Sequence, residues 1–163
     1  MLYFQDGPLT VRPLEQEDCE AFPRCFAAQG WEKPRALFRR YLEEQGRGER
    51  RGVVALWDGE QAGYLTLLPE APAGAFAGKG WPEICDFNVL ETYQRRGVGS
   101  RLLQVAEELA GEASDTVCLG VGLHSGYGAA QRLYSKRGYL PDGSGVWYRD
   151  APMEPYGPCA ADD

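Results

Sequence analysis

A short apolar strand that leads through a glycine turn into an amphipathic helix constrains the fold more than any other feature of this chain. Residues 83–89 carry the strand pattern, Gln94-Arg-Arg-Gly-Val-Gly99 forms the turn, and apolar residues then recur at helical spacing as far as Gly111. Glycines at alternate positions let the N–H groups of a helix N-terminus approach a ligand closely. Because these groups and the helix dipole attract anions, the segment predicts a pyrophosphate site.

Two better-known phosphate motifs do not fit this segment. No Gly-Lys-Ser/Thr follows the glycines, so it is not a Walker loop. The third glycine of a dinucleotide fingerprint would fall at Leu102, and the strand lies in the middle of the chain. A plain turn that uses glycine only for its geometry stays open at this point.

Length, charge and cysteine content narrow the class of protein. A chain of 163 residues is expected to form one domain. The net charge of −7 argues against a nucleic-acid partner and is compatible with a cationic substrate. No apolar run approaches a membrane span, so no membrane partner is expected. The five cysteines have no paired metal spacing, which predicts no metal site and favours a cytoplasmic location.

The hydrophobic pattern predicts an α/β fold with a mixed sheet and helices on both sides. The expected strands are residues 9–12, 53–57, 63–68, 83–89, 116–123, 139–140 and 146–149, and the expected helices are residues 15–28, 34–45, 98–111 and 128–136. The continuous apolar run 116–123 is typical of a strand that is covered on both faces. Residues 1–7 look like a tag remnant and are expected to be flexible, and residues 151–163 are expected to form an irregular tail.

Two linked segments resemble the GNAT superfamily of N-acetyltransferases. Val89 and the turn Gln94-Arg-Arg-Gly-Val-Gly99 match its Gln/Arg-x-x-Gly-x-Gly/Ala acetyl-CoA motif. Ala129-Ala-Gln-Arg-Leu-Tyr-Ser-Lys-Arg-Gly-Tyr139 is similar to its Ala-x-x-Leu-Tyr-x-x-x-Gly-Phe segment. The resemblance covers residues 8–150 and implies a single N-acetyltransferase domain with a central mixed β-sheet.

The resemblance also implies how acetyl-CoA is held. The family's fourth and fifth strands, here residues 83–89 and 116–123, splay apart so that pantetheine lies between them and satisfies their free backbone groups. Tyr127 replaces the Asn that many members carry before the second segment. The residues implied at the cofactor are Phe87, Asn88, Val89, Gln94, Arg95, Arg96, Gly97, Val98, Gly99, Ser100 and Tyr127.

Amine acetylation needs a base near the amine and an acid near sulfur. A protonated alkyl amine cannot attack, and a thiol leaves more easily when it is protonated. The resemblance places the base at Glu83, six residues before Val89, and the acid at Tyr134. Asp86 is the rival base, since a carboxylate within an apolar strand needs a partner or a purpose. Simple alternation puts Asp86 opposite Glu83, on the face of Ile84 and Asn88, unless a bulge intervenes.

The preferred function is transfer of acetyl from acetyl-CoA to a primary amine by direct attack in a ternary complex. The acceptor is expected to be a small molecule or a peptide amine, and the family's acceptor regions here contain Trp31, Phe76 and Trp81. Transfer of a longer acyl group, or a CoA-binding sensor or toxin-type protein, stays open. Because little chain remains for the family's last strand, a shortened C-terminus or a homodimer stays open as well.

Overall fold

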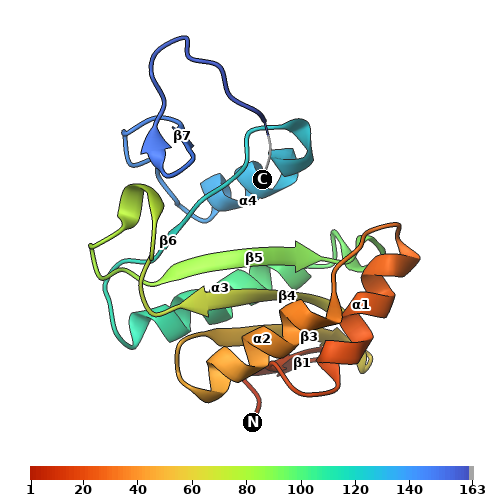
Figure 1. Cartoon of the computed structure of the whole chain (residues 1–163). Coiled ribbons are helices and arrows are strands. Elements are labelled where there is room, and N and C mark those ends of the chain that lie inside the picture. The colour runs from red at the N-terminus through yellow and green to blue at the C-terminus, as the bar shows by residue number, and fades with distance from the viewer. Residues whose placement is uncertain (162–163) are drawn as a thin grey trace.

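The computed structural model describes residues 1–161, and its centre is a six-stranded mixed sheet in the order β1-β2-β3-β4-β5-β6 (Figure 1). The first five strands pair antiparallel, and β6 alone runs parallel to its neighbour β5. The strands are β1 Phe4–Asp6, β2 Leu9–Pro13, β3 Arg51–Trp57, β4 Glu60–Leu68, β5 Glu83–Val89 and β6 Cys118–Leu119. The mixed α/β sheet that the sequence predicts is therefore confirmed.

Helices cover both faces of the sheet (Figure 1). They are α1 Asp18–Ala28 and α2 Arg35–Gly46 on one face and α3 Val98–Gly111 on the other, while α4 Gly128–Lys136 lies beyond the β5–β6 edge of the sheet. On one face, Phe22, Phe26 and Phe38 of α1 and α2 surround the buried ring of Tyr64. On the other face, the apolar stripe of α3 packs on β2 to β5. None of the described helices is both long enough and apolar enough to cross a membrane.

The sixth strand is shorter than the apolar run 116–123 predicts. Only two residue pairs join β6 to β5, Glu83 with Cys118 and Ile84 with Leu119, and the chain then diverges from β5. Val121 and Leu123 beyond this point are 38% and 59% exposed. The expectation of a strand covered on both faces is thus wrong past Leu119, because the diverging chain has no strand beside it among residues 1–161.

The two ends of the chain also differ from expectation. Phe4–Asp6, within the segment expected to be flexible, forms β1 on the edge of β2, and the Arg101 guanidinium lies 3.6 Å from the Phe4 ring centroid. The predicted strand at residues 139–140 is absent from the described chain. Strands β7 Trp147–Tyr148 and β8 Ala151–Pro152 form a separate hairpin, and residues 153–161 contain no helix or strand. Residues 162–163 of the predicted tail lie outside the described residues.

Candidate active site

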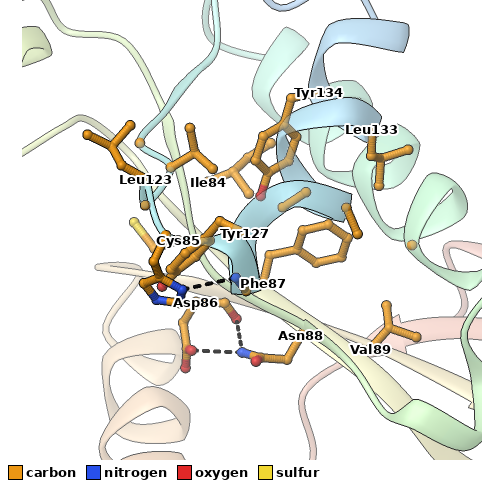
Figure 2. Close-up of a pocket in the computed structure, with 18 of the residues that line it drawn as sticks. Ile84, Cys85, Asp86, Phe87, Asn88, Val89, Leu123, Tyr127, Leu133 and Tyr134 are labelled. Carbon is orange, nitrogen blue, oxygen red and sulfur yellow. Dashed lines mark hydrogen bonds between the residues drawn. The ribbon is translucent and has the colours of Figure 1, made fainter. Parts of the chain in front are cut away.

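A cleft of about 1740 Å³ opens where β5 and the chain after β6 separate. Its walls include strand β5, residues 120–124, helix α4, the connection between α1 and α2, and residues 146–149 and 159–161 near the C-terminus. The first turn of α3 lines it as well. Figure 2 shows the ring of Phe87 of β5 near the ring of Tyr134 of α4, with Asp86 and Asn88, the residues on either side of Phe87, joined by hydrogen bonds. Two segments distant in sequence therefore meet at one cavity, as the family resemblance implies.

The first turn of α3 presents backbone N–H groups to this cleft. Gly97, the residue before the helix, has a left-handed backbone with φ of +83°, and within residues 1–161 no side chain caps the helix. A Cβ on Gly99 would lie 3.2 Å from Cζ of Phe87, so glycine lets α3 approach β5 closely. The N–H groups of an uncapped helix start are suited to an anion.

Most of the residues predicted at the cofactor line this cleft. Those that do are Phe87, Asn88, Val89, Gln94, Arg95, Gly97, Gly99, Ser100 and Tyr127. Arg96 and Val98 do not. The Arg96 guanidinium lies over the rings of Trp57 and Tyr93, and the side chain of Val98 is buried in the core beneath α3. Their side chains therefore anchor the turn, whose backbone still borders the cleft.

A bulge in β5 overturns the alternation that the sequence suggests. Tyr64 pairs with Asn88 and Thr66 with Cys85, so Asp86 and Phe87 together stand opposite the single residue Leu65. Asp86 adopts φ of +46°, which is rare for a residue other than glycine. As a result its carboxylate lies on the α1 and α2 side of the sheet. The prediction that Asp86 shares a face with Ile84 is wrong, because Ile84 packs in the core on the opposite side.

Four donors hold the Asp86 carboxylate. Oδ1 accepts hydrogen bonds from Lys33 Nζ at 2.7 Å and Asn88 Nδ2 at 2.9 Å. Oδ2 accepts from the hydroxyls of Tyr64 at 2.5 Å and Tyr41 at 3.1 Å. Burial alone would raise the pKa of Asp86, but the hydrogen bond and charge of Lys33, with both tyrosines, lower it below 3.8. Asp86 is therefore a firmly ionised anion.

Lys33 completes a site suited to a primary ammonium. Its Nζ also donates to the Tyr64 hydroxyl at 2.7 Å and lies 5.4 Å and 5.3 Å from the ring centroids of Phe26 and Tyr64. Aromatic faces at such distances attract a cation. Beside it, the exposed Trp31 borders the cleft, whereas Phe76 and Trp81, which pack against each other at 5.9 Å between ring centroids, do not line it. Sequence reasoning noted that Asp86 needs a partner but missed Lys33, Tyr41 and Tyr64.

Glu83 pairs with Cys118 in one of the two residue pairs that join β5 to β6. Its side chain does not line the cleft. It is on the same face of β5 as Cys85, whose partner Thr66 accepts a hydrogen bond from Arg50. Burial raises the pKa of Glu83 above 4.5, although Cys85 and the positive charge of Arg50 oppose the shift. A carboxylate with a raised pKa accepts a proton more readily than Asp86 does.

Tyr134 is buried on α4 and borders the cleft. Its ring centroid lies 6.2 Å from that of Phe87 and 5.8 Å from that of Tyr139. Burial, and to a lesser degree Tyr127, raises the pKa of Tyr134 to about 12. The hydroxyl therefore keeps its proton throughout the neutral range and can donate it.

Among residues 1–161, no group of three or more His, Cys, Asp and Glu side chains is arranged to hold a metal ion. The only histidine, His124, contacts the ring of Tyr127 at 4.8 Å between centroids, and its Nδ1 accepts from the backbone N–H of Gly126. Gln131 of α4 donates to the backbone of Gly122, which ties α4 to the diverging segment. These contacts shape one wall of the cleft.

Comparisons with known proteins agree with this arrangement. A ribosomal-protein acetyltransferase from Salmonella typhimurium, which modifies the N-terminal serine of a 50S subunit protein, has a TM-score of 0.70 and 13% identity, over 88% of this chain and 87% of that one. The structure of yncA from the same species, solved with its cofactor acetyl-CoA, has a TM-score of 0.63 and 20% identity, over 82% of this chain and 80% of that one. Likenesses of this kind confirm the fold.

Comparisons of the amino-acid sequence identify the family to which the chain belongs. Over 70 residues the chain is 37% identical to mycothiol acetyltransferase of Mycolicibacterium vanbaalenii, a match that covers 43% of this chain and only 21% of that protein. The chain thus spans about a fifth of the length of this curated relative. The model of the acetyltransferase (GNAT) family matches residues 11–139. The chain therefore belongs to the acetyltransferase (GNAT) family, as its two sequence motifs predict.

Proposed function

We propose that this protein transfers an acetyl group from acetyl-CoA to a primary amine, with both substrates bound in the cleft beside β5. The observation that carries the proposal is the early end of β5–β6 pairing, after two residue pairs, in front of the uncapped start of α3. The gap offers free backbone groups to an amide-rich arm, and the helix start offers N–H groups to a diphosphate. Membership of the acetyltransferase family supports the same assignment.

The residues present fit acetyl-CoA. The pyrophosphate is assigned to backbone N–H groups of residues 97–100, and the pantetheine arm to the edge of β5 at Phe87, Asn88 and Val89. Tyr127 and the side chains of Gln94 and Arg95 border the same channel. When bound, acetyl-CoA supplies an activated acetyl group as a thioester.

Two side chains are assigned to proton transfer. Glu83 is the proposed base, because burial raises its pKa, and it acts through water because it stands back from the cleft. Asp86 is less suited to this task, since four donors stabilise its ionised form. Tyr134 is the proposed acid, which protonates the departing thiolate. A backbone N–H near Val89 is the proposed donor to the carbonyl oxygen.

The acceptor is proposed to enter beside the α1–α2 connection, past Trp31, and to be a small-molecule or peptide amine. The name of one structural relative, an acetyltransferase that modifies the N-terminal serine of a ribosomal protein, supports a peptide amine, and the name of the curated relative, mycothiol acetyltransferase, points to a small molecule. All five cysteines are free thiols, which agrees with a cytoplasmic location. A homodimer stays a prediction that light scattering can test.

Two measurements test the proposal. Calorimetry with coenzyme A should show saturable binding, and a panel of amines should produce thiol release from acetyl-CoA with at least one member. Glu83→Gln should lower turnover far more than coenzyme A affinity. If coenzyme A does not bind at all, the assignment of the cleft is wrong.

A further inference from the structure

The chain places one of its own primary amines on the acceptor side of the cleft. Lys33 borders the cleft together with Phe87 and Asn88, and its side chain is 16% exposed. Its Nζ is the sole ammonium that the structure describes against Asp86, and it is held there by two hydrogen bonds of 2.7 Å, one to Asp86 and one to Tyr64. The amine is therefore fixed in position rather than free in solvent.

The surroundings of this amine hold it in one position beside β5. The bulge and the left-handed backbone of Asp86 turn its carboxylate toward the α1–α2 connection. The Tyr64 hydroxyl accepts a second hydrogen bond from Nζ, and the aromatic faces of Phe26 and Tyr64 complete the set of partners. Because this set lies beside the strand assigned to the pantetheine arm, Lys33 stands on the side of the cleft where the acceptor amine is proposed to enter.

We propose that Lys33 is a self-acetylation site of this enzyme. The inference rests on the proposed function, since the acetyl donor is acetyl-CoA. The Lys33 ammonium first gives one proton to solvent, and Nζ then attacks the thioester carbonyl carbon. An N–C bond forms, the C–S bond breaks, the nitrogen loses a second proton to solvent, and the departing sulfur takes up one proton from Tyr134, which regains a proton from solvent. The product is an amide on Lys33 and free coenzyme A.

The small number of lysines in the chain lets a single experiment distinguish self-acetylation from chemical acetylation. The sequence has three lysines, Lys33, Lys79 and Lys136, and its other 14 of 17 basic residues are arginines. Lys79 and Lys136 are exposed, whereas Lys33 is partly buried and ion-paired. A reagent without a binding site reacts first with exposed amines, so chemical acetylation favours Lys79 and Lys136. Self-acetylation favours Lys33, the least accessible of the three.

Acetylation also changes the electrostatics of the cleft. An acetylated Lys33 is neutral, so Asp86 loses its counter-charge and keeps only the hydrogen bonds from Tyr41, Tyr64 and Asn88. Arginine at position 33 preserves a cation for Asp86 and is not an acceptor. Lys33→Arg is therefore the variant that separates loss of the amine from loss of the charge.

The test is a time course of the full chain with acetyl-CoA, followed by mass spectrometry of the intact protein and of its peptides. The expected result is one acetyl group, on Lys33, formed at a rate that does not change when the protein is diluted. Lys33→Arg should abolish the modification and Lys79→Arg should leave it unchanged. Tyr134→Phe should slow it on the order of a hundredfold, the effect of losing a general acid. Acetic anhydride serves as the reference reagent and should label Lys79 and Lys136 first.

The outcomes separate this inference from the proposed function. Coenzyme A binding and transfer to an added amine, with Lys33 unmodified, would overturn the inference and leave the proposed function intact. Equal labelling of all three lysines would overturn it too, because that is the pattern of uncatalysed chemistry. No coenzyme A binding would remove the proposed function and self-acetylation together. Thermal denaturation and coenzyme A affinity of Lys33→Arg verify that the variant is folded.

Discussion

Lys33 Nζ and Asp86 Oδ1 lie 2.7 Å apart and join the α1–α2 connection to the bulged strand β5. Both side chains are largely removed from solvent, with 16% and 23% of their surface exposed. The pair therefore fixes one wall of the cleft and sets its charge.

Asp86→Asn should lower the free energy of unfolding by about 1–3 kcal/mol. Removing one partner of a buried ion pair leaves the other uncompensated, and partial exposure reduces the cost. Urea denaturation measures the change. Asp142→Asn, at an exposed carboxylate bound to Ser144, is the matched control and should cost less. In a double-mutant cycle with Lys33→Met the two changes should be strongly coupled, and additive effects would contradict the pairing.

The contribution of Asp86 to stability should disappear in acid. Its pKa in the folded protein is lowered below the ordinary 3.8, so folding gains from the ionised form. That gain is complete above pH 3.8 and is lost as the pH falls through the lower folded value. The difference in unfolding free energy between the unaltered chain and Asp86→Asn should therefore be constant near neutrality and shrink below about pH 4. A difference that grows in acid would mean that Asp86 is protonated in the folded state.

The decrease of kcat/KM at acidic pH, the acid limb of its pH profile, should reflect the protonation of Glu83. Because burial raises its pKa above 4.5 and a base must be ionised, activity should fall as the pH drops through a value higher than 4.5. Glu83→Gln should reduce kcat/KM by about 10²–10⁴-fold and remove that limb. Asp86→Asn should retain it. A pH profile that keeps the same limb in Glu83→Gln assigns the base elsewhere.

Tyr134→Phe should reduce kcat on the order of a hundredfold while coenzyme A affinity changes little. The hydroxyl, whose pKa is raised to about 12, is a proton donor at neutral pH, and the ring that packs on Phe87 and Tyr139 remains in the variant. Steady-state kinetics and calorimetry measure the two quantities. Equal loss of both would indicate that Tyr134 only supports the wall of the cleft.

The parts of the fold that local sequence determines were predicted well. Helix α3 runs from Val98 to Gly111 as its 3.6-residue pattern indicates, and β5 and α4 have the expected bounds. Leu102 and Ala106 are fully buried on the expected face. In these segments the amphipathic pattern and the contacts in the folded chain agree, so the sequence alone suffices.

Features that depend on distant partners were not predicted. The Asp86 carboxylate, turned by its left-handed backbone, accepts hydrogen bonds from Lys33, Tyr41 and Tyr64, which come from the α1–α2 connection, α2 and β4. Simple alternation along a strand does not take such contacts into account, and it therefore predicts the wrong face of the sheet for Asp86. The apolar run at residues 116–123 gave a strand that is too long, because apolarity alone does not show whether a neighbouring strand stays alongside.

Gly97→Ala should weaken coenzyme A binding and cost about 1 kcal/mol of stability. Gly97 has φ of +83°, and alanine is strained there although a Cβ would meet no atom within 4 Å. Gly111→Ala is the control, since that glycine has neither a positive φ nor a close neighbour. Calorimetry should give a lower affinity for Gly97→Ala alone. Equal coenzyme A affinities of the two variants would mean that the turn before α3 does not contribute to coenzyme A binding.

The most direct test of the cleft as the coenzyme A site is a backbone-amide NMR titration of the full chain with coenzyme A. The N–H signals of Gly97, Gly99 and Ser100 at the start of α3, and of Phe87 to Val89 on β5, should shift most and saturate together. Large shifts confined to other surfaces, or no shifts at saturating coenzyme A, would contradict the account.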